Sequence, residues 1–284
     1  MPMNAKLVDD IANAVLYEGY LLYPYRASAI KNKQRWNFGV LYPREYAEMQ
    51  SGADAWKMQT ECLAIADSGA TLNVRVRFLK LTSDGAVERE LELPPVELST
   101  LASRHDFIEA VVELEATQVA EGVFRIRTTI LNTSSHGSSN RDDALLHSLV
   151  STHTILNIRG AISTQRAEFV SLLDPPEHLR DFASACQNVG AWPVLLGEPS
   201  QRDTMLSSPI ILYDYPQIAP ESPGALFDGT EIDEILSLRI MTLTDEEKLE
   251  MATGDERARQ ILERTESMPQ EQFMKLHGVL KVRS

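Results

Sequence analysis

Cysteine and histidine are the side chains of this sequence best suited to hold a transition metal, and both are scarce. The chain contains two cysteines, Cys62 and Cys186, and six histidines spread along its length. Thiolate and imidazole ligands suit zinc or iron, so a metal site formed by Cys62, His153 and Cys186 is one hypothesis. The alternative is structural: the thiols act as small buried apolar groups, and the histidine is hydrogen-bonded at a strand end. The sequence favours the structural alternative and leaves metal binding open.

The common motifs of enzyme active sites are missing from the sequence. The two common glycine-rich phosphate-binding patterns, G-x-G-x-x-G and G-x-x-x-x-G-K-[ST], do not occur. The patterns G-x-S-x-G, H-E-x-x-H and C-x-x-C are also absent. Asp174, Glu177 and His178 place two carboxylates beside an imidazole, which would suit acid–base chemistry. Asp174 also suits the cap of a helix, and we prefer that explanation because no nucleophile accompanies the group. The sequence therefore predicts no catalytic residues and no cofactor, and favours a non-enzymatic role without excluding an enzyme.

Two segments are rich in the side chains that dominate protein interfaces. Six of the eight tyrosines lie between Tyr17 and Tyr46, together with five basic residues, and a proline-rich segment runs from Tyr213 to Gly224. Tyrosine, tryptophan and arginine often carry much of the binding energy between proteins. We expect partner contacts from Arg26, Lys31, Lys33, Arg35, Trp36, Tyr42, Tyr213, Asp214 and Tyr215. The alternative for the first segment is that its rings close one end of the fold.

Charge and hydropathy restrict the classes of function. The net charge of −14 argues against nucleic-acid binding, because neutralising phosphates requires a basic surface. No apolar run approaches the roughly 18 to 20 residues needed to cross a bilayer. Asp9 and Asp10 interrupt the apolar stretch that a secretory signal would need. These features predict a cytoplasmic protein that does not span a membrane and whose two thiols are reduced.

Alternation of apolar and charged residues in the middle of the chain predicts antiparallel β-structure. Residues 72–78 and 87–93 flank Asp84 and Gly85 as a hairpin would, with a bulge or the end of the strand expected near Phe78. A second hairpin is predicted to join residues 108–116 and 124–130, with glutamates opposite arginines on one face. Outside the hairpins we expect helices over 6–18 and 177–187, and strands over 151–159, 168–173, 192–196 and 209–213.

These elements predict a mainly β (α+β) fold: an antiparallel β-sandwich or partly open barrel with a helical C-terminal extension. The expected organisation has three parts. Residues 1–50 form an N-terminal helix and a basic aromatic arm, residues 51–228 form the sandwich core, and residues 229–284 form an acidic helical extension.

Four blocks of sequence carry a family resemblance when they are read together. They cover residues 15–26, 58–62, 169–176 and 208–221. The chain resembles, over nearly its whole length, a bacterial accessory-protein family found in gene clusters for nickel-iron hydrogenases of the uptake type. The resemblance implies a role in hydrogenase assembly, maturation or anchoring, with hydrogenase subunits as partners, and it carries over no catalytic residues.

The leading hypothesis from the sequence is a non-catalytic interaction or assembly protein that serves such a hydrogenase. The second is a metal-dependent enzyme or metallochaperone that uses Cys62, Cys186 and histidines. A third is a small-molecule binder that uses the sandwich interior. The sequence leaves a homo-oligomer open.

Overall fold

A computed structural model describes residues 8–13, 15–16, 39–50, 54–67, 69–82, 85–100, 102–136, 140–161, 167–217 and 263. The chain divides into two compact units, one made of Met1–Ala12 and Asn37–Pro216 and the other of Asn13–Trp36 and Gln217–Ser284. Nearly all described residues belong to the first unit. Most of the predicted aromatic arm and, apart from Glu263, the predicted helical extension lie outside the described residues.

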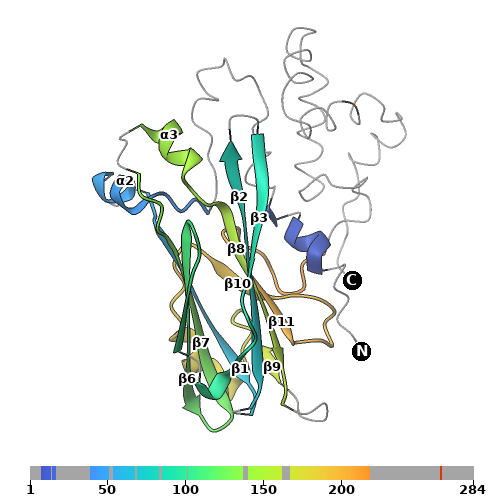
Figure 1. Cartoon of the computed structure of the whole chain (residues 1–284). Helices are drawn as coiled ribbons and strands as arrows, with labels where there is room; N and C mark the ends of the chain where they lie inside the picture. The colour runs from blue at the N-terminus through green and yellow to red at the C-terminus, as the bar shows by residue number, and fades with distance from the viewer. Residues whose placement is uncertain are drawn as a thin grey trace. The chain divides into compact units, whose positions relative to one another are not determined.

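Antiparallel pairing organises the first unit into two sheets that pack against each other (Figure 1), which confirms the predicted β-sandwich. The first sheet has the order β5-β6-β7-β1-β9 and consists of β1 (Lys57–Ile65), β5 (Ala102–Asp106), β6 (Ala110–Ala120), β7 (Val123–Asn132) and β9 (Glu168–Val170). The second has the order β10-β11-β8-β2-β3 and consists of β2 (Thr71–Thr82), β3 (Gly85–Glu92), β8 (Val150–Arg159), β10 (Trp192–Leu195) and β11 (Thr204–Ser208), with β4 (Val96–Glu97) paired to β2.

Both predicted hairpins form. In the first, Gly85 pairs with Thr82 and opens β3, so the connection is residues 83–84, which lie outside the described residues. In the second, Gly122 has a φ of +68°, a backbone conformation that favours glycine. The predicted cross-strand pairing holds for Glu115 and Arg127, whose side chains are 2.8 Å apart.

The bulge predicted near Phe78 is present on the side of β2 that pairs with β8, whereas the hairpin pairing of β2 with β3 is continuous there. The register between β2 and β8 shifts between Arg77 and Leu79. The predicted N-terminal helix forms over the described residues 8–13 and 15–16. Within the first unit, Asp9 of this helix accepts a hydrogen bond from Arg75 Nη2 of β2 at 3.1 Å. In the described part of the chain, no helix combines the length and apolar character needed to cross a membrane.

The predicted strand over 209–213 was wrong. The strand β11 lies just upstream and ends at Ser208, immediately before Pro209. Proline has no backbone N–H to continue a ladder, and Ile211 beyond it is largely exposed. The apolar run over 210–212 therefore belongs to a surface segment.

The helix predicted over 177–187 ends earlier than expected, and its first turn is a 3₁₀ turn. It consists of a 3₁₀ turn, η3 (Glu177–Leu179), followed by α4 (Arg180–Ser184). Its N-cap is Pro176, which makes no side-chain capping bond, so the predicted capping role of Asp174 was wrong. The backbone N–H of Asp174 instead donates to the hydroxyl of Ser171 at 2.9 Å.

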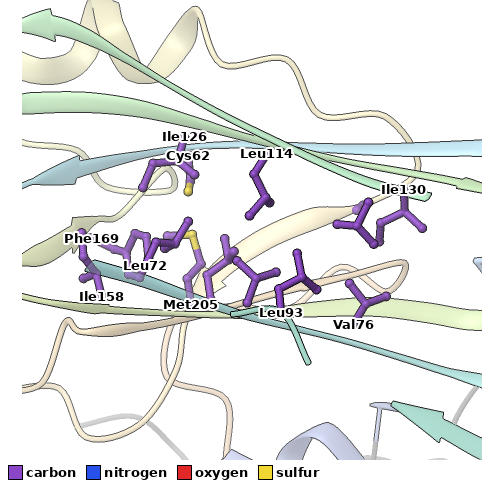
Figure 2. Close-up of a cluster of buried hydrophobic side chains, with 14 of the residues drawn as sticks. Cys62, Leu72, Val76, Leu93, Leu114, Ile126, Ile130, Ile158, Phe169 and Met205 are labelled. Atoms are coloured by element: carbon purple, nitrogen blue, oxygen red, sulfur yellow. The ribbon is translucent and has the colours of Figure 1, made fainter. Parts of the chain in front are cut away.

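The main core lies between the sheets and draws side chains from both inner faces (Figure 2). Residues of the first sheet face residues of the second across this layer, as labelled for Cys62, Leu114, Ile126, Ile130, Phe169, Leu72, Val76, Ile158 and Met205. A smaller cluster, which includes Leu63 and Val170, packs Leu179 and Ala183 against the outer face of the first sheet. Alternating strand residues thus give the first sheet two buried faces near β1.

Candidate functional site

Two features of the first unit are suited to a function. One is a set of three exposed apolar side chains, Trp192 of β10 and Ile211 and Tyr213 of the segment that returns beside it, here called the edge strip. The other is a group of three side chains, His136, Asp143 and His147, here called the histidine cluster.

The edge strip follows β10, the last strand in the order of the second sheet. Its three side chains are exposed to 43%, 72% and 86% for Trp192, Ile211 and Tyr213. Trp192 pairs with Ser208 of β11, whose hydroxyl donates to the carbonyl of Ile210 at 2.7 Å. The chain then returns beside β10. The pairing of Trp192 with Ser208 at one end, and the bonds of Leu195 to Asp214 and Tyr215 at the other, place the two segments of the strip side by side.

Asp214 fixes the segment that carries the strip. Its carboxylate accepts the backbone N–H of Leu195 in β10 at 2.8 Å and also accepts the hydroxyl hydrogen of Ser171. Ser171 directly follows β9, which belongs to the first sheet. One carboxylate therefore ties the edge of the second sheet to the end of a strand in the first.

Tyr215 anchors the same segment from its other end. Its backbone N–H donates to the carbonyl of Leu195 at 2.8 Å, and its ring packs against the main core. It adopts a positive φ of 56°, a conformation that is uncommon for residues other than glycine. Its buried hydroxyl finds no hydrogen-bond partner among the residues that the structure describes. Tyr215 is therefore an internal anchor.

The residues predicted to contact a partner have different locations. Arg26, Lys31, Lys33, Arg35 and Trp36 lie outside the described residues. The structure places Asp214 and Tyr215 in internal contacts and leaves Tyr213 exposed. Tyr42 is buried: its hydroxyl accepts a hydrogen bond from Arg141 Nε at 3.1 Å, and its ring lies 5.0 Å from that of Tyr46. These two tyrosines match the alternative in which the rings close one end of the fold.

Local helix geometry explains two members of the histidine cluster. The helix α3 (Arg141–Leu146) begins after Asn140, whose side chain accepts the backbone N–H of Asp142 at 3.0 Å. Asp143 and His147 are four residues apart, so one helical turn places their side chains on the same face. His147 is the C-cap residue of α3.

His136 completes the cluster from the segment that follows β7. Its Nε2 lies 3.1 Å from Oδ2 of Asp143. Its ring stacks on that of His147, with centroids 4.3 Å apart and an interplanar angle of 13°. One candidate ligand atom from each of the three partly buried residues lies within 4.8 Å of the others. Two imidazoles and a carboxylate form a ligand set that suits zinc and ferrous iron.

A buried amide fixes the backbone on both sides of the cluster. Asn132 Nδ2 donates to the carbonyl of His147 at 2.9 Å and to that of Leu41 at 2.7 Å. Its Oδ1 accepts the backbone N–H of Ser134 at 2.8 Å. Because Ser134 is two residues before His136, Asn132 connects both segments that supply imidazoles. In Figure 1 this cluster's helix, α3, and α2 (Arg44–Met49) lie at the same end of the sandwich.

The structure does not bring Cys62, His153 and Cys186 together. Cys62 points into the main core between the sheets (Figure 2), and burial raises the pKa of its thiol. Cys186 packs with the smaller cluster outside the first sheet, where burial raises its pKa as well. His153 is on the opposite face of β8 from core residue Leu156, because the two are an odd number of positions apart.

The environment of His153 opposes its charged form. Its Nδ1 lies 3.1 Å from the carbonyl of Ser151, and its buried Nε2 has no hydrogen-bond partner in the described structure. Burial lowers its pKa to about 4, and nearby Arg77 and Arg75 contribute in the same direction. Among the described residues, the histidine cluster is the group of His, Cys, Asp and Glu side chains close enough to share an ion.

Sequence reasoning missed this cluster. The spacing of Asp143 and His147, following a capping residue at Asn140, would have placed the carboxylate and one imidazole on one helix face. His136 lies on a separate segment and gave no such signal.

Comparison with known proteins gives no family. No protein-family model matches the chain, and no curated protein sequence matches it.

Proposed function

We propose that this protein is a non-catalytic interaction or assembly factor that binds a protein partner through the edge strip. The observation that carries the proposal is the joint exposure of Trp192, Ile211 and Tyr213 beside one strand. Exposed apolar groups gathered on one surface mark sites of association. Tryptophan and tyrosine are also the side chains most enriched among the residues that dominate interface energies.

The backbone contacts of the strip support docking through side chains. An edge strand commonly binds a partner by adding a further strand to its free backbone groups. At Leu195, however, Asp214 accepts from the N–H and Tyr215 donates to the carbonyl. These groups are already used within the chain, so the exposed rings of Trp192 and Tyr213 are the better contacts.

The resemblance of the four sequence blocks supports a subunit of a nickel-iron hydrogenase as the partner. We place the interaction in the cytoplasm, because Cys62 and Cys186 are both free thiols, as is usual in a reducing compartment. The protein would then help the hydrogenase assemble, mature or anchor, without taking part in its chemistry.

Deletion of the gene tests this function in the organism that encodes it. The expected result is weaker association of the hydrogenase subunits and lower hydrogenase activity, both restored by the wild-type gene. A gene carrying Ile211→Ser and Tyr213→Ser is expected to restore neither, although the variant protein accumulates normally. Unchanged subunit association and activity after deletion would remove the basis for the proposal.

Metal handling is a second candidate function. Its support comes from the histidine cluster, since the structure separates Cys62, His153 and Cys186.

A further inference from the structure

We propose that His136, Asp143 and His147 bind one divalent first-row transition-metal ion, with zinc as the reference ion. Nothing in the proposed docking function requires this site, and the edge strip contains none of its residues. Two neutral imidazoles favour zinc, iron, cobalt, nickel or copper over magnesium and calcium, which prefer all-oxygen ligands.

The separation of two ligand atoms already fits a shared ion. His136 Nε2 and Asp143 Oδ2 are 3.1 Å apart. Two atoms bound to one zinc ion at roughly 2.0 to 2.2 Å each lie about 3 to 3.5 Å from one another in tetrahedral or octahedral geometry. Metal binding would replace this hydrogen bond, because His136 Nε2 must give up its proton to coordinate the ion, but the separation of the two atoms would change little.

The third ligand must move to complete the site. The three ligand atoms lie within 4.8 Å of one another, an upper limit longer than the edge of a zinc coordination shell. The rings of His136 and His147 are also nearly parallel, at 13°. Imidazole binds a metal in the plane of its ring, so two stacked rings do not aim at one point. Metal binding must turn at least one ring out of the stack.

The backbone around the cluster supports this small rearrangement. Asn132 holds the carbonyl of His147 and the N–H of Ser134, while the hydroxyl of Ser148 donates to the carbonyl of Ala144 in α3 at 2.7 Å. These bonds hold the backbone of both segments, so we expect the rearrangement to consist of side-chain rotation. Three protein ligands leave a fourth position for water or for a donor from a partner, as in other three-ligand zinc sites.

A purely structural role is the competing explanation. In that case the stack and the bond between His136 and Asp143 only hold the segment after β7 against α3. The two explanations differ in a measurable way. A purely structural cluster is not expected to bind an ion stoichiometrically or to impose a defined coordination geometry on it.

Titration of the full-length, untagged protein with Zn²⁺ and with Co²⁺ tests the proposal. We expect one ion per chain by calorimetry, and visible d–d absorption bands when Co²⁺ occupies the site. His136→Gln and Asp143→Asn are each expected to weaken Zn²⁺ binding about 100-fold or more and to abolish the Co²⁺ bands. His178→Gln removes an exposed histidine elsewhere on the chain and is expected to change neither measurement.

Circular dichroism of each variant separates loss of the site from loss of the fold. His136→Gln is the decisive variant because it lies outside α3. Absence of stoichiometric binding to the wild type, or binding that folded His136→Gln and Asp143→Asn variants retain at full strength, would overturn the proposal. Neither result would bear on partner docking, which is measured without added metal.

Discussion

Glu61 of β1 and Arg127 of β7 face each other in register, and Glu61 Oε1 lies 2.7 Å from two nitrogens of the Arg127 guanidinium. The second carboxylate oxygen of Glu61 accepts the backbone N–H of Gln187 at 2.7 Å. Arg127 also pairs with Glu115 at 2.8 Å. One arginine therefore has two acidic partners, whose side chains are exposed to 2% for Glu61 and 52% for Glu115.

This arrangement provides a matched pair of variants. Glu61→Gln removes the charge of a buried acceptor that makes several hydrogen bonds, so we expect it to lower the free energy of unfolding by about 2 kcal/mol. Glu115→Gln removes a solvated partner of the same arginine and is expected to cost less than about 0.5 kcal/mol. Urea denaturation measures both. Equal effects of the two substitutions would show that burial does not decide the strength of these pairs.

Asp214 is expected to contribute to stability, unlike its neighbour Tyr213. Asp214→Asn replaces one acceptor oxygen with an amide group that cannot accept the hydroxyl hydrogen of Ser171 or replace the carboxylate charge. We expect a loss of about 1 to 2 kcal/mol in the free energy of unfolding. Tyr213→Ser, at an exposed position, should change it by less than about 0.5 kcal/mol. Thermal unfolding of the two variants distinguishes these outcomes.

His153 should make stability depend on pH in a defined window. Its pKa is lowered from 6.5 to about 4 in the folded protein, mainly by burial. Between these values the unfolded chain binds a proton that the folded chain does not, so stability decreases as the pH falls from 6.5 to 4. The stability that the protein loses in this way is at most about 3 kcal/mol. It is fully retained above pH 6.5.

Denaturation curves at several pH values test this dependence against a variant. In the His153→Gln variant, the part of the pH dependence of the free energy of unfolding that is due to this residue should disappear, although the variant is less stable overall. His178→Gln, at an exposed position, should leave the pH dependence unchanged. If the free energy of unfolding of His153→Gln depends on pH as steeply as that of the wild type, other groups cause the pH dependence.

The two thiols should differ in reactivity. Cys62 is buried in the main core, whereas Cys186 is partly exposed. Burial raises the pKa of both thiols, which lowers the fraction of reactive thiolate. A coloured thiol reagent should label Cys186 slowly and Cys62 only after unfolding. The Cys186→Ser variant should therefore show no labelling while folded and one thiol in urea. Labelling of folded Cys186→Ser would contradict the placement of Cys62.

The strands that could be predicted from the sequence are those with one consistently apolar face. Residues 72–78 alternate because one side of β2 faces the main core, and β6 and β7 show the same pattern. In contrast, β11 has hydroxyl groups where an apolar pattern would be expected. Ser207 points inward and bonds the hydroxyl of Thr60 at 2.6 Å across the two sheets. A strand stabilised by a polar bond between the sheets gives no hydrophobic periodicity to detect.

The candidate sites were less predictable because tertiary contacts assemble them. Trp192 and Tyr213 are distant in sequence, and the bonds from Leu195 to Asp214 and Tyr215 bring their segments together. The sequence marked Tyr213 as an interface residue, but it could not distinguish it from the internally bonded Asp214. Similarly, Asn132 connects the segment of His136 to His147 through contacts that no local pattern reveals.

Docking of a hydrogenase subunit on the edge strip is the proposed function. Its most direct test is quantitative affinity capture at native expression levels, comparing the wild-type protein with a Trp192→Ser, Ile211→Ser, Tyr213→Ser variant that is shown to be folded. We expect hydrogenase subunits to be enriched with the wild type and reduced at least about tenfold with the variant. Equal recovery of these subunits with both proteins, or no enrichment with the wild type, would contradict it.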